Sequence, residues 1–287
     1  MKVAINGFGR IGKLVFRAFL ERKIKEFEIV AINELGSLES SYHLLKFDST
    51  HGLLNQDISL KKNYLKYGNK NIHFYSERDP NNLPWKKLGI DIVLECSGVF
   101  TSKEKSLAHI NSGAKKVIIS APSTGVDATI VQGVNENTLN NKHQIISNGS
   151  CTTNCLAPIA MVLDKEIGIS SGFMTTVHSF TGDQNTVDQV HKDLRRARTA
   201  TDSLIPTSTG AAKALGLVLP NLSGKLDGTA IRVPTSNVSL IDLTFVSKKK
   251  TSVKKINQIM IKASKSSKLK NILTINKLPL VSIDFNH

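Results

Sequence analysis

The chain has 287 residues, 40% hydrophobic and 21% charged, as in a globular protein with one large or two ordinary domains. Its three cysteines are too few for a disulfide framework and lack zinc-ligand spacing, so we expect reduced thiols in a cytoplasmic setting and no metal. No apolar run is long enough to span a bilayer, and the N-terminus lacks a secretory pattern.

The formal net charge is +15, and residues 248–287 contribute much of it. That stretch holds ten lysines and a single acid, Asp284. Because Phe285 is its only aromatic residue, base stacking has little support there. A solvated lysine-rich surface is therefore favoured over a nucleic-acid site.

In the first half, apolar strand patterns alternate with helical ones. The sequence predicts strands over 2–6, 28–33, 91–97, 116–120 and 144–147, a helix over 11–22, and a second helix that opens with a Thr101–Glu104 capping box and runs to about His109. Extended loops are expected before Pro80 and Pro84. Strands separated by helices indicate an α/β fold with a doubly wound parallel sheet.

The pattern changes near residue 150. A helix is expected over 152–166, followed by β-rich stretches over 172–180 and 229–246, with further helices over 210–219 and 252–264. Strands grouped with fewer helices indicate an α+β second domain. We therefore expect two domains, residues 1–149 and 150–287.

A glycine pattern follows the first strand. Gly7, Gly9 and Gly12 form G-x-G-x-x-G between a predicted strand and a predicted helix, the context of a Rossmann-type dinucleotide site. Such glycines allow close approach of the pyrophosphate to backbone N–H groups at a helix N-terminus. Glu34, at the end of the second strand, is placed to bond ribose hydroxyls, which favours NAD over NADP.

Cys151 and His178 are the strongest candidates for chemistry. Cys151 precedes the helix over 152–166, where the helix dipole and free N–H groups favour a thiolate. His178 lies in the β-rich stretch that follows and could stabilise that thiolate. Cys155 and Cys96 have apolar neighbours, so we expect both to be buried core residues.

Beyond these features, the chain resembles the phosphorylating (type I) glyceraldehyde-3-phosphate dehydrogenases. The resemblance rests on stretches in the family's order throughout the chain: 4–12 (AINGFGRIG), 46–52 (KFDSTHG), 147–155 (SNGSCTTNC), the His178 segment, 193–198 (DLRRAR), 206–213 (PTSTGAAK) and 231–235 (IRVPT). The cysteine-containing stretch is the most specific of them.

The resemblance implies that residues 150–287 form a catalytic domain with Cys151 as nucleophile and His178 as acid–base partner. It implies NAD as cofactor, with glyceraldehyde 3-phosphate and inorganic phosphate as substrates of glycolysis. For substrate and phosphate binding it points to Ser150, Thr152, Thr181, Arg196, Thr209, Gly210 and Arg232. For NAD it points, besides the three glycines and Glu34, to Arg10, Ile11, Arg78 and Ser120. It also implies a homotetramer, with no membrane partner.

Two departures from the family leave alternatives open. Glu34 stands where the family more often has aspartate, and Ile32-Asn-Glu-Leu35 resembles the erythrose-4-phosphate dehydrogenases. The chain ends at His287, whereas the family continues through a strand, an asparagine that holds the nicotinamide, and a long helix. The alternatives are therefore an erythrose-4-phosphate dehydrogenase or an inactive, truncated NAD-binding remnant.

Overall fold

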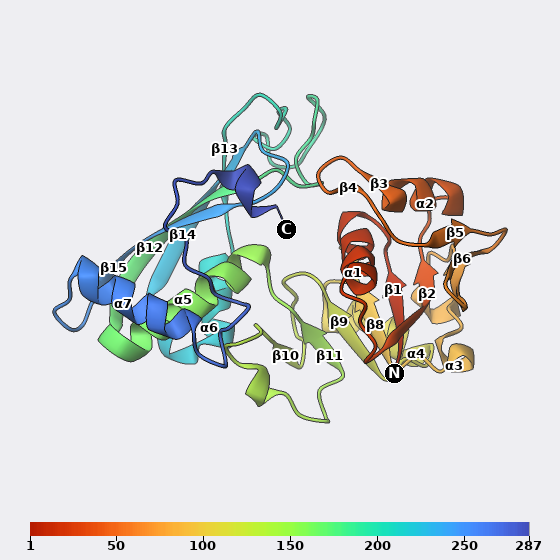
Figure 1. The fold of residues 1–287 in the computed structure, drawn as a ribbon, viewed down its shortest axis with the longest axis horizontal. Coiled ribbons are helices and arrows are strands. Elements are labelled where there is room, and N and C mark those ends of the chain that lie inside the picture. The colour runs from red at the N-terminus through yellow and green to blue at the C-terminus, as the bar shows by residue number, and fades with distance from the viewer. Residues whose placement is uncertain (287) are drawn as a thin grey trace. The chain divides into compact units, whose positions relative to one another are not determined.

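The computed structural model describes residues 1–286, so His287, the last residue of the expected catalytic domain, lies outside them. The chain divides into two compact units. The first comprises Met1–Ile130 and Leu139–Gly149, and the second comprises Val131–Thr138 and the chain from Ser150 onward. Figure 1 labels the elements of each unit.

The first unit is built on a nine-stranded sheet with the order β10-β11-β9-β8-β1-β2-β7-β6-β5. Neighbours from β10 to β7 are parallel, whereas β7–β6 and β6–β5 are antiparallel. The strands are β1 (Lys2–Asn6), β2 (Glu28–Asn33), β5 (Ile58–Leu60), β6 (Tyr64–Tyr67), β7 (Lys70–Tyr75), β8 (Ile92–Glu95), β9 (Lys116–Ile119), β10 (Ala128–Thr129) and β11 (Ile145–Ser147). A separate hairpin joins β3 (Phe47–Asp48) and β4 (Gly52–Leu53).

Helices cover both faces of this sheet. The helices are α1 (Arg10–Glu21), α2 (Leu38–Lys46), α3 (Trp85–Leu88) and α4 (Lys103–Asn111), with 3-10 turns η1 (Pro80–Asn82) and η2 (Glu136–Thr138), of which η2 belongs to the second unit. One core packs Phe16 and Leu20 of α1 against Val3 and Ile5 of β1. Ala4 faces the other core, with Trp85 and its neighbours. The α/β, doubly wound prediction is confirmed, with a parallel-rich sheet.

Two local expectations for the first unit were incomplete or wrong, and the extended residues expected before Pro80 and Pro84 are present at Asp79 and Leu83. The β5–β7 strands and α2 were not predicted, although Gly68-Asn69 forms the two-residue link between β6 and β7. The cap of α4 is Ser102, not Thr101: the Ser102 hydroxyl accepts from Lys105 N at 3.3 Å. Short helices follow directly on the extended residues before Pro80 and Pro84.

The second unit has a four-stranded mixed sheet with the order β13-β14-β12-β15. The strands are β12 (Ile169–Ser179), β13 (Ile205–Ser208), β14 (Leu226–Val233) and β15 (Leu240–Ser247), so the expected stretch over 229–246 is two strands rather than one. The helices are α5 (Cys151–Ile167), α6 (Ala211–Val218) and α7 (Val253–Ser264), with 3-10 turns η3 (Pro220–Leu222) and η4 (Ser282–Phe285).

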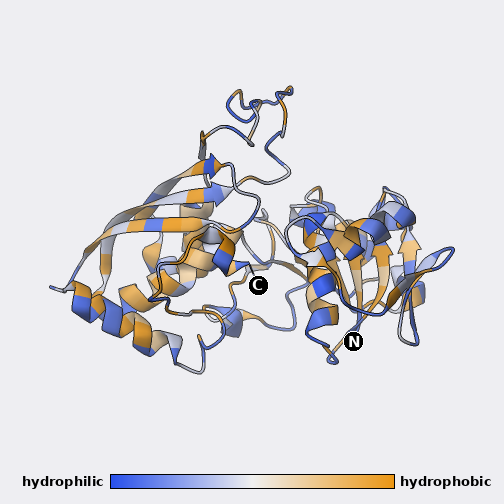
Figure 2. Ribbon diagram, turned by 45° about the horizontal axis from the view of Figure 1, so that its top comes forward, coloured by the Kyte–Doolittle hydropathy of each residue, from blue (hydrophilic) through white to orange (hydrophobic). Residues whose placement is uncertain are grey.

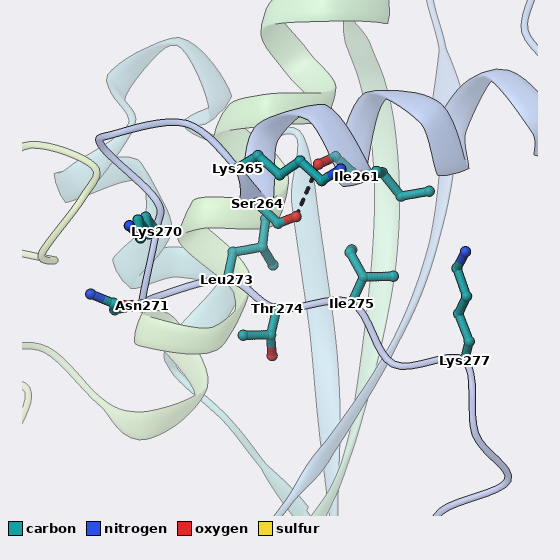
Figure 3. A pocket seen from close by; sticks show the side chains of 9 residues that line it. All are labelled: Ile261, Ser264, Lys265, Lys270, Asn271, Leu273, Thr274, Ile275 and Lys277. Carbon is teal, nitrogen blue, oxygen red and sulfur yellow. Dashed lines mark hydrogen bonds between the residues drawn. The ribbon is translucent and has the colours of Figure 1, made fainter.

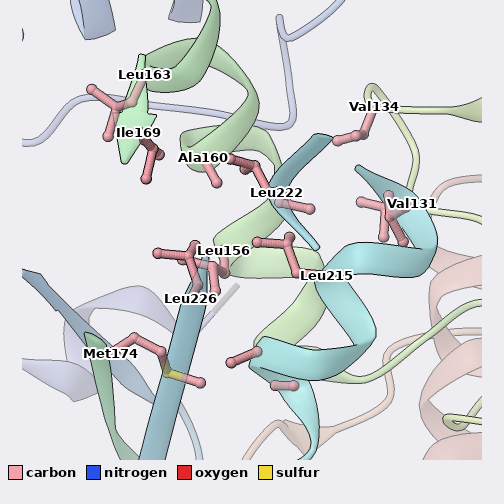
Figure 4. Close-up of a cluster of buried hydrophobic side chains, with 14 of the residues drawn as sticks. Val131, Val134, Leu156, Ala160, Leu163, Ile169, Met174, Leu215, Leu222 and Leu226 are labelled. Atoms are coloured by element: carbon pink, nitrogen blue, oxygen red, sulfur yellow. The ribbon is translucent and has the colours of Figure 1, made fainter. Parts of the chain in front are cut away.

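The core of this unit lies between the sheet and its helices. Leu156 of α5 and Leu215 of α6 pack against Met174 of β12 and Leu226 of β14 (Figure 4). Apolar and polar residues alternate along the strands, and the helices carry both kinds (Figure 2). One face of the sheet contributes to the core, whereas side chains on the opposite face, such as Phe173 and Val246, are exposed, and no helix within residues 1–286 buries them.

No helix within residues 1–286 combines the length and apolar character needed to cross a membrane.

Candidate active site and nucleotide pocket

A cavity of about 360 Å³ opens in the first unit, where neighbouring parallel strands end. Its wall includes strand-terminal residues Asn6 of β1 and Asn33 of β2. The complete lining is Asn6, Gly7, Gly9, Asn33, Glu34, Leu35, Glu77, Arg78, Cys96, Ser97, Val99 and Phe100. The carboxyl ends of parallel strands are the usual ligand position in open α/β sheets.

The glycine turn is shaped by close backbone packing. Gly7 has φ +86°, and a Cβ there would lie 2.4 Å from Ser97 N, so only glycine fits without strain. A Cβ on Gly12 would lie 2.2 Å from Gly7 O, which explains how α1 starts so close to the turn. Around Gly9, by contrast, the described residues leave the Cβ position open. The turn is therefore tight on the protein side and accessible at Gly9.

Glu34 is fixed at the edge of this cavity. Its Oε2 accepts from Phe8 N at 2.7 Å and its Oε1 accepts from Gly36 N at 3.1 Å. Arg78 lines the same cavity and is exposed. A carboxylate, an arginine and the N-terminus of α1 beside an open glycine are the groups that a ribose and a pyrophosphate require. The residues present therefore fit a dinucleotide.

The other expected nucleotide contacts lie outside the lining of this cavity. Arg10 Nη1 donates to Asp48 Oδ2 at 2.9 Å, so its guanidinium is held toward the β3–β4 hairpin. Ile11 and Ser120 are exposed, and the Ser120 side chain hydrogen bonds to the Cys96 thiol. These residues flank the turn and the strand end without forming the wall of the cavity.

Sequence reasoning missed eight wall residues, of which Asn6, Asn33, Glu77 and Ser97 are polar and Leu35, Cys96, Val99 and Phe100 are not. Asn6 and Asn33 are each the last residue of a predicted parallel strand. That position was a usable signal, because the carboxyl ends of adjacent parallel strands meet at one edge of the sheet. Ser97 ends the predicted strand over 91–97 and carried the same signal, although the observed β8 ends at Glu95, whereas Glu77 lies in a loop and carried none.

In the second unit, Cys151 is the first residue of α5 and its thiol faces His178. Ser150 caps the helix by accepting from Thr153 N at 3.0 Å, which fixes the helix start one residue before the cysteine. Cys151 Sγ lies 3.1 Å from His178 Nε2. The hydrogen bond with His178 lowers the pKa of the Cys151 thiol, and a hydrogen bond with Thr152 contributes further, against the opposing effect of burial.

His178 is buried near the end of β12 and is held through its other ring nitrogen. Nδ1 lies 2.7 Å from Ser179 O and 2.6 Å from Arg232 Nη1, and that guanidinium also donates to Ser179 O at 2.9 Å. Because a guanidinium only donates, the contact with Arg232 Nη1 makes Nδ1 an acceptor, which places the ring proton on Nε2, where it faces the thiol. The two partners orient the ring toward Cys151.

Arg232 pairs with His178 in the parallel register of β12 and β14. Burial lowers the pKa of Arg232. The charges of Cys151 and Asp183 oppose this effect, whereas the positive charge of Arg196 adds to it. Its Nε is buried and has no partner within residues 1–286. A buried donor without an acceptor is costly, so this N–H is a candidate for binding an anionic ligand.

Arg196 is anchored beside β13. Its Nε and Nη2 both donate to Thr207 Oγ1, at 3.0 and 2.7 Å, and Nη1 donates to Asp183. Asp193 Oδ2 lies 3.5 Å from Nε. The guanidinium is therefore oriented by Thr207 and shared with two carboxylates.

The remaining expected anion contacts are hydroxyls and one backbone group. Thr181 donates through both N and Oγ1 to Gln184 Oε1. Thr209 Oγ1 accepts from Ala211 N at 3.2 Å, next to Gly210 at the N-cap of α6. Ser150, which caps α5, and Thr152 directly flank the thiol. The structure thus brings Cys151, His178 and Arg232 into direct contact, with Ser150 and Thr152 adjacent in the chain.

The two other cysteines behave differently. Cys155 is exposed, so the expectation of a buried core residue was wrong: it lies on the solvent side of α5, where its apolar sequence neighbours gave no indication of the face. Although the residue is exposed, desolvation of its thiol by nearby protein atoms, and next the neighbouring Cys151, raise the pKa of Cys155. Cys96 is partly buried against the core, and burial raises the pKa of its thiol to about 11.

A second cavity, of about 410 Å³, lies between the end of α7 and the segment that follows it (Figure 3). Its lining includes Lys265, Lys270 and Lys277 with apolar side chains such as Leu273. It contains no cysteine, histidine or carboxylate, so it offers no nucleophile or acid–base group.

Comparison with known proteins identifies the family to which the chain belongs. Residues 1–103 match the family model described as glyceraldehyde 3-phosphate dehydrogenase, NAD binding domain, and residues 150–287 match the C-terminal domain of the same family. The chain is 56% identical over 287 residues to glyceraldehyde-3-phosphate dehydrogenase of Xanthobacter flavus, covering 100% of this chain and 85% of the relative. Identity is 54% over 286 residues to the Zymomonas mobilis enzyme, covering 99% and 85%, and 53% over 287 residues to the Geobacillus stearothermophilus enzyme, covering 100% and 85%. The chain therefore belongs to the glyceraldehyde-3-phosphate dehydrogenase family, and it is an NAD-dependent dehydrogenase.

Proposed function

We propose that this chain oxidises D-glyceraldehyde 3-phosphate to 1,3-bisphosphoglycerate with NAD and inorganic phosphate, a step of glycolysis. The observation that carries the proposal is the 3.1 Å contact between Cys151 Sγ and His178 Nε2 at the start of α5, in a chain of this family. A thiolate held by an imidazole is an activated nucleophile for a carbonyl carbon.

The reaction follows from the two side chains. The Cys151 thiolate attacks the aldehyde carbon, a C–S bond forms, and the carbonyl oxygen takes the Nε2 proton of His178 to give a thiohemiacetal. His178 Nε2 accepts the hydroxyl proton as the carbon loses a hydride. NAD, when bound, supplies the hydride acceptor. A phosphate oxygen then attacks the resulting thioester, the C–S bond breaks, and Cys151 leaves as a thiolate.

Two anions take part, the phosphate group of the substrate and inorganic phosphate. The unpartnered Nε of Arg232 supports a role in binding one of them, together with Thr181. For the other we propose Arg196, with the residues Ser150, Thr152, Thr209 and Gly210. Arg196 is already oriented by Thr207, so little side-chain ordering would accompany binding.

For the cofactor, we propose residues 1–149 as the NAD-binding domain and residues 150–287 as the catalytic domain. The pyrophosphate would lie at the open Gly9, between Gly7 and Gly12, with Arg10 and Ile11 in the first turn of α1. Glu34 would bond ribose hydroxyls, while Arg78 and Ser120 would lie on the adenine and ribose side.

We further propose a homotetramer in the cytoplasm. The face of the second sheet that lacks helices exposes apolar side chains, with Phe173, Leu240 and Val246 respectively 50%, 58% and 60% exposed. Exposed apolar side chains on one face of a sheet are typical of an interface between subunits. The three cysteines are free, as a reducing compartment favours.

Purified protein tests the function directly through NADH formation from glyceraldehyde 3-phosphate, phosphate and NAD. We expect turnover in the wild type, none in Cys151→Ser, and turnover in the matched control Cys155→Ser. The Cys151→Ser variant should still bind NAD. Retained turnover in Cys151→Ser would contradict the mechanism, and turnover with erythrose 4-phosphate alone would redirect the substrate assignment.

A further inference from the structure

A buried polar network lies directly below the nucleotide cavity and takes no part in the proposed chemistry. It starts at Glu95, the last residue of β8, whose side chain is 1% exposed. In the parallel register Glu95 pairs with Asn6 of β1, and Asn6 pairs with Asn33 of β2. Three adjacent strand ends therefore present a carboxylate and two amides side by side, and both amides line the cavity.

The hydrogen bonds along this row have one direction. The backbone N–H of Glu77 donates to Asn33 Oδ1 at 2.8 Å, which fixes the orientation of that amide. Asn33 Nδ2 donates to Asn6 Oδ1 at 2.7 Å, and Asn6 Nδ2 donates to Glu95 Oε2 at 2.6 Å. Each amide accepts through its oxygen from one neighbour and donates through its NH₂ to the next. The row must therefore end in a group that accepts, which is Glu95.

A second donor reaches Glu95 from α4. His109 is fully buried, and its Nε2 lies 3.0 Å from Glu95 Oε2. Its Nδ1 lies 3.1 Å from the indole Nε1 of Trp85. Since an indole N–H can only donate, Nδ1 must accept, and the ring proton is on Nε2 facing Glu95. Trp85 thus fixes the tautomer of His109.

The other carboxylate oxygen holds the loop opposite the glycine turn. Glu95 Oε1 accepts from Ser97 N at 2.7 Å and from the Ser97 hydroxyl. Ser97 N is also the atom closest to the Cβ position of Gly7, at 2.4 Å. The carboxylate therefore sets the position of the wall against which the glycine turn packs.

We infer that Glu95 is a positioning residue for NAD binding, acting through Asn6 and Ser97 on the floor and wall of the pocket. The inference rests on the proposed function in one respect, that this cavity is the NAD site. Four donors converge on the two carboxylate oxygens, and an ionised carboxylate, which only accepts, satisfies all of them. No other side chain of similar size accepts four hydrogen bonds.

The variant Glu95→Gln makes the inference testable. An amide in either orientation turns an NH₂ toward donors, either those of Ser97 or those of Asn6 and His109. His109 cannot adapt by moving its proton to Nδ1, because that nitrogen faces the indole N–H of Trp85. We expect the pocket to relax and the dissociation constant of NAD, measured by isothermal titration calorimetry, to rise about tenfold or more.

A positioning role is separated from general destabilisation by kinetics. Glu95→Gln should raise the KM for NAD while leaving kcat at saturating NAD and the KM for glyceraldehyde 3-phosphate within about twofold of wild type. Loss of folded protein would instead lower kcat with KM unchanged. Glu28→Gln is the matched control, because Glu28 lies in the same sheet in a partly exposed pair with Lys70 at 3.0 Å. It should leave NAD binding unchanged.

Glu95→Asp covers the case in which Glu95→Gln does not fold. Aspartate keeps the acceptor but is one methylene shorter, so it cannot reach both Asn6 and Ser97, and we expect the NAD dissociation constant to rise about threefold or more. A folded Glu95→Gln or Glu95→Asp protein with wild-type NAD affinity would overturn the inference. The titration does not need turnover, so an inactive wild type that binds NAD would refute the proposed reaction and leave this test intact.

Discussion

The reactivity of Cys151 depends on one side-chain neighbour. The hydrogen bond from His178 is the largest cause that lowers the pKa of the thiol, ahead of the groups contributed by Thr152. A depressed pKa means that the thiolate persists as the pH falls below the value at which an ordinary cysteine would protonate. The helix start brings the thiol to the imidazole, and the imidazole then determines its charge.

Replacement of His178 should therefore slow thiol chemistry before any substrate is involved. In His178→Asn we expect the pKa of Cys151 to rise and the alkylation rate with iodoacetamide at pH 7 to fall several-fold, because less of the thiol is ionised at that pH. The pH profile of alkylation, resolved by peptide mapping, measures the shift. Cys155 provides an internal reference, since its rate should not decrease; an unchanged Cys151 profile would count against the assigned pair.

The orientation of Arg196 offers a second test at single-residue scale. Thr207 Oγ1 accepts two hydrogen bonds from this guanidinium. Thr207→Val keeps the shape of the side chain and removes the acceptor, at a cost of about 1 kcal/mol per hydrogen bond. We expect the KM for inorganic phosphate to rise several-fold with little change in the KM for NAD. Thr244→Val, at an exposed position of β15, should change neither value.

At the scale of elements, two glycines of the same turn have different roles. Gly7 is required for the turn to fold, whereas Gly9 leaves room for a bound ligand. Gly7→Ala places a side chain at φ +86° and within 2.4 Å of Ser97 N, so unfolding free energy should fall by about 2 kcal/mol or more. Gly9→Ala meets open space at φ −71°, so stability should change little. Its methyl group instead occupies the path of the pyrophosphate, and NAD affinity should fall. Urea denaturation and calorimetric titration measure the two effects; equal losses of stability would contradict the distinction.

The elements with regular periodicity were predictable from sequence, and the rest were not for identifiable reasons. The strand–turn–helix at Lys2–Glu21 combines an apolar run, a glycine pattern and helical spacing, so several signals agree. The β6–β7 hairpin has exposed polar residues and a single weak turn signal, Gly68-Asn69, which was overlooked. Which face of α5 carries Cys155 depends on packing with α6 and the sheet, and no local pattern encodes that choice.

The candidate site shows the same division. Cys151 and His178 were identified from their local settings, and the structure brings them to 3.1 Å. The network below the cavity joins residues far apart in the chain, such as Asn6 and Glu95. Such contacts follow from sheet register, which short-range patterns do not specify. Strand-terminal polar residues were the one unused signal, and they lead to Asn6, Asn33 and Ser97, whose backbone N–H binds Glu95 at the observed end of β8.

At the scale of the whole molecule, the uncovered face of the second sheet is the feature that a single chain does not explain. Phe173 of β12 lies opposite Thr244 of β15, and Ser171 lies opposite Val246, so exposed side chains of both strands share one face. A sheet with only one covered face normally alternates apolar and polar residues, with the polar ones outward. Apolar residues on the outer face therefore favour association through this surface.

Charge on that face should dissociate the proposed homotetramer. In the double variant Phe173→Glu/Val246→Glu, two carboxylates per chain would be buried without partners at each contact, which is strongly unfavourable. We expect the sedimentation coefficient to fall to that of a smaller species, with the thermal transition of each unit retained because neither side chain belongs to a core. Val253→Glu, at an exposed apolar position of α7, is the matched control and should leave the assembly intact. A double variant that sediments like the wild type would exclude this face as the interface, and the apolar side chains on it would then require another partner.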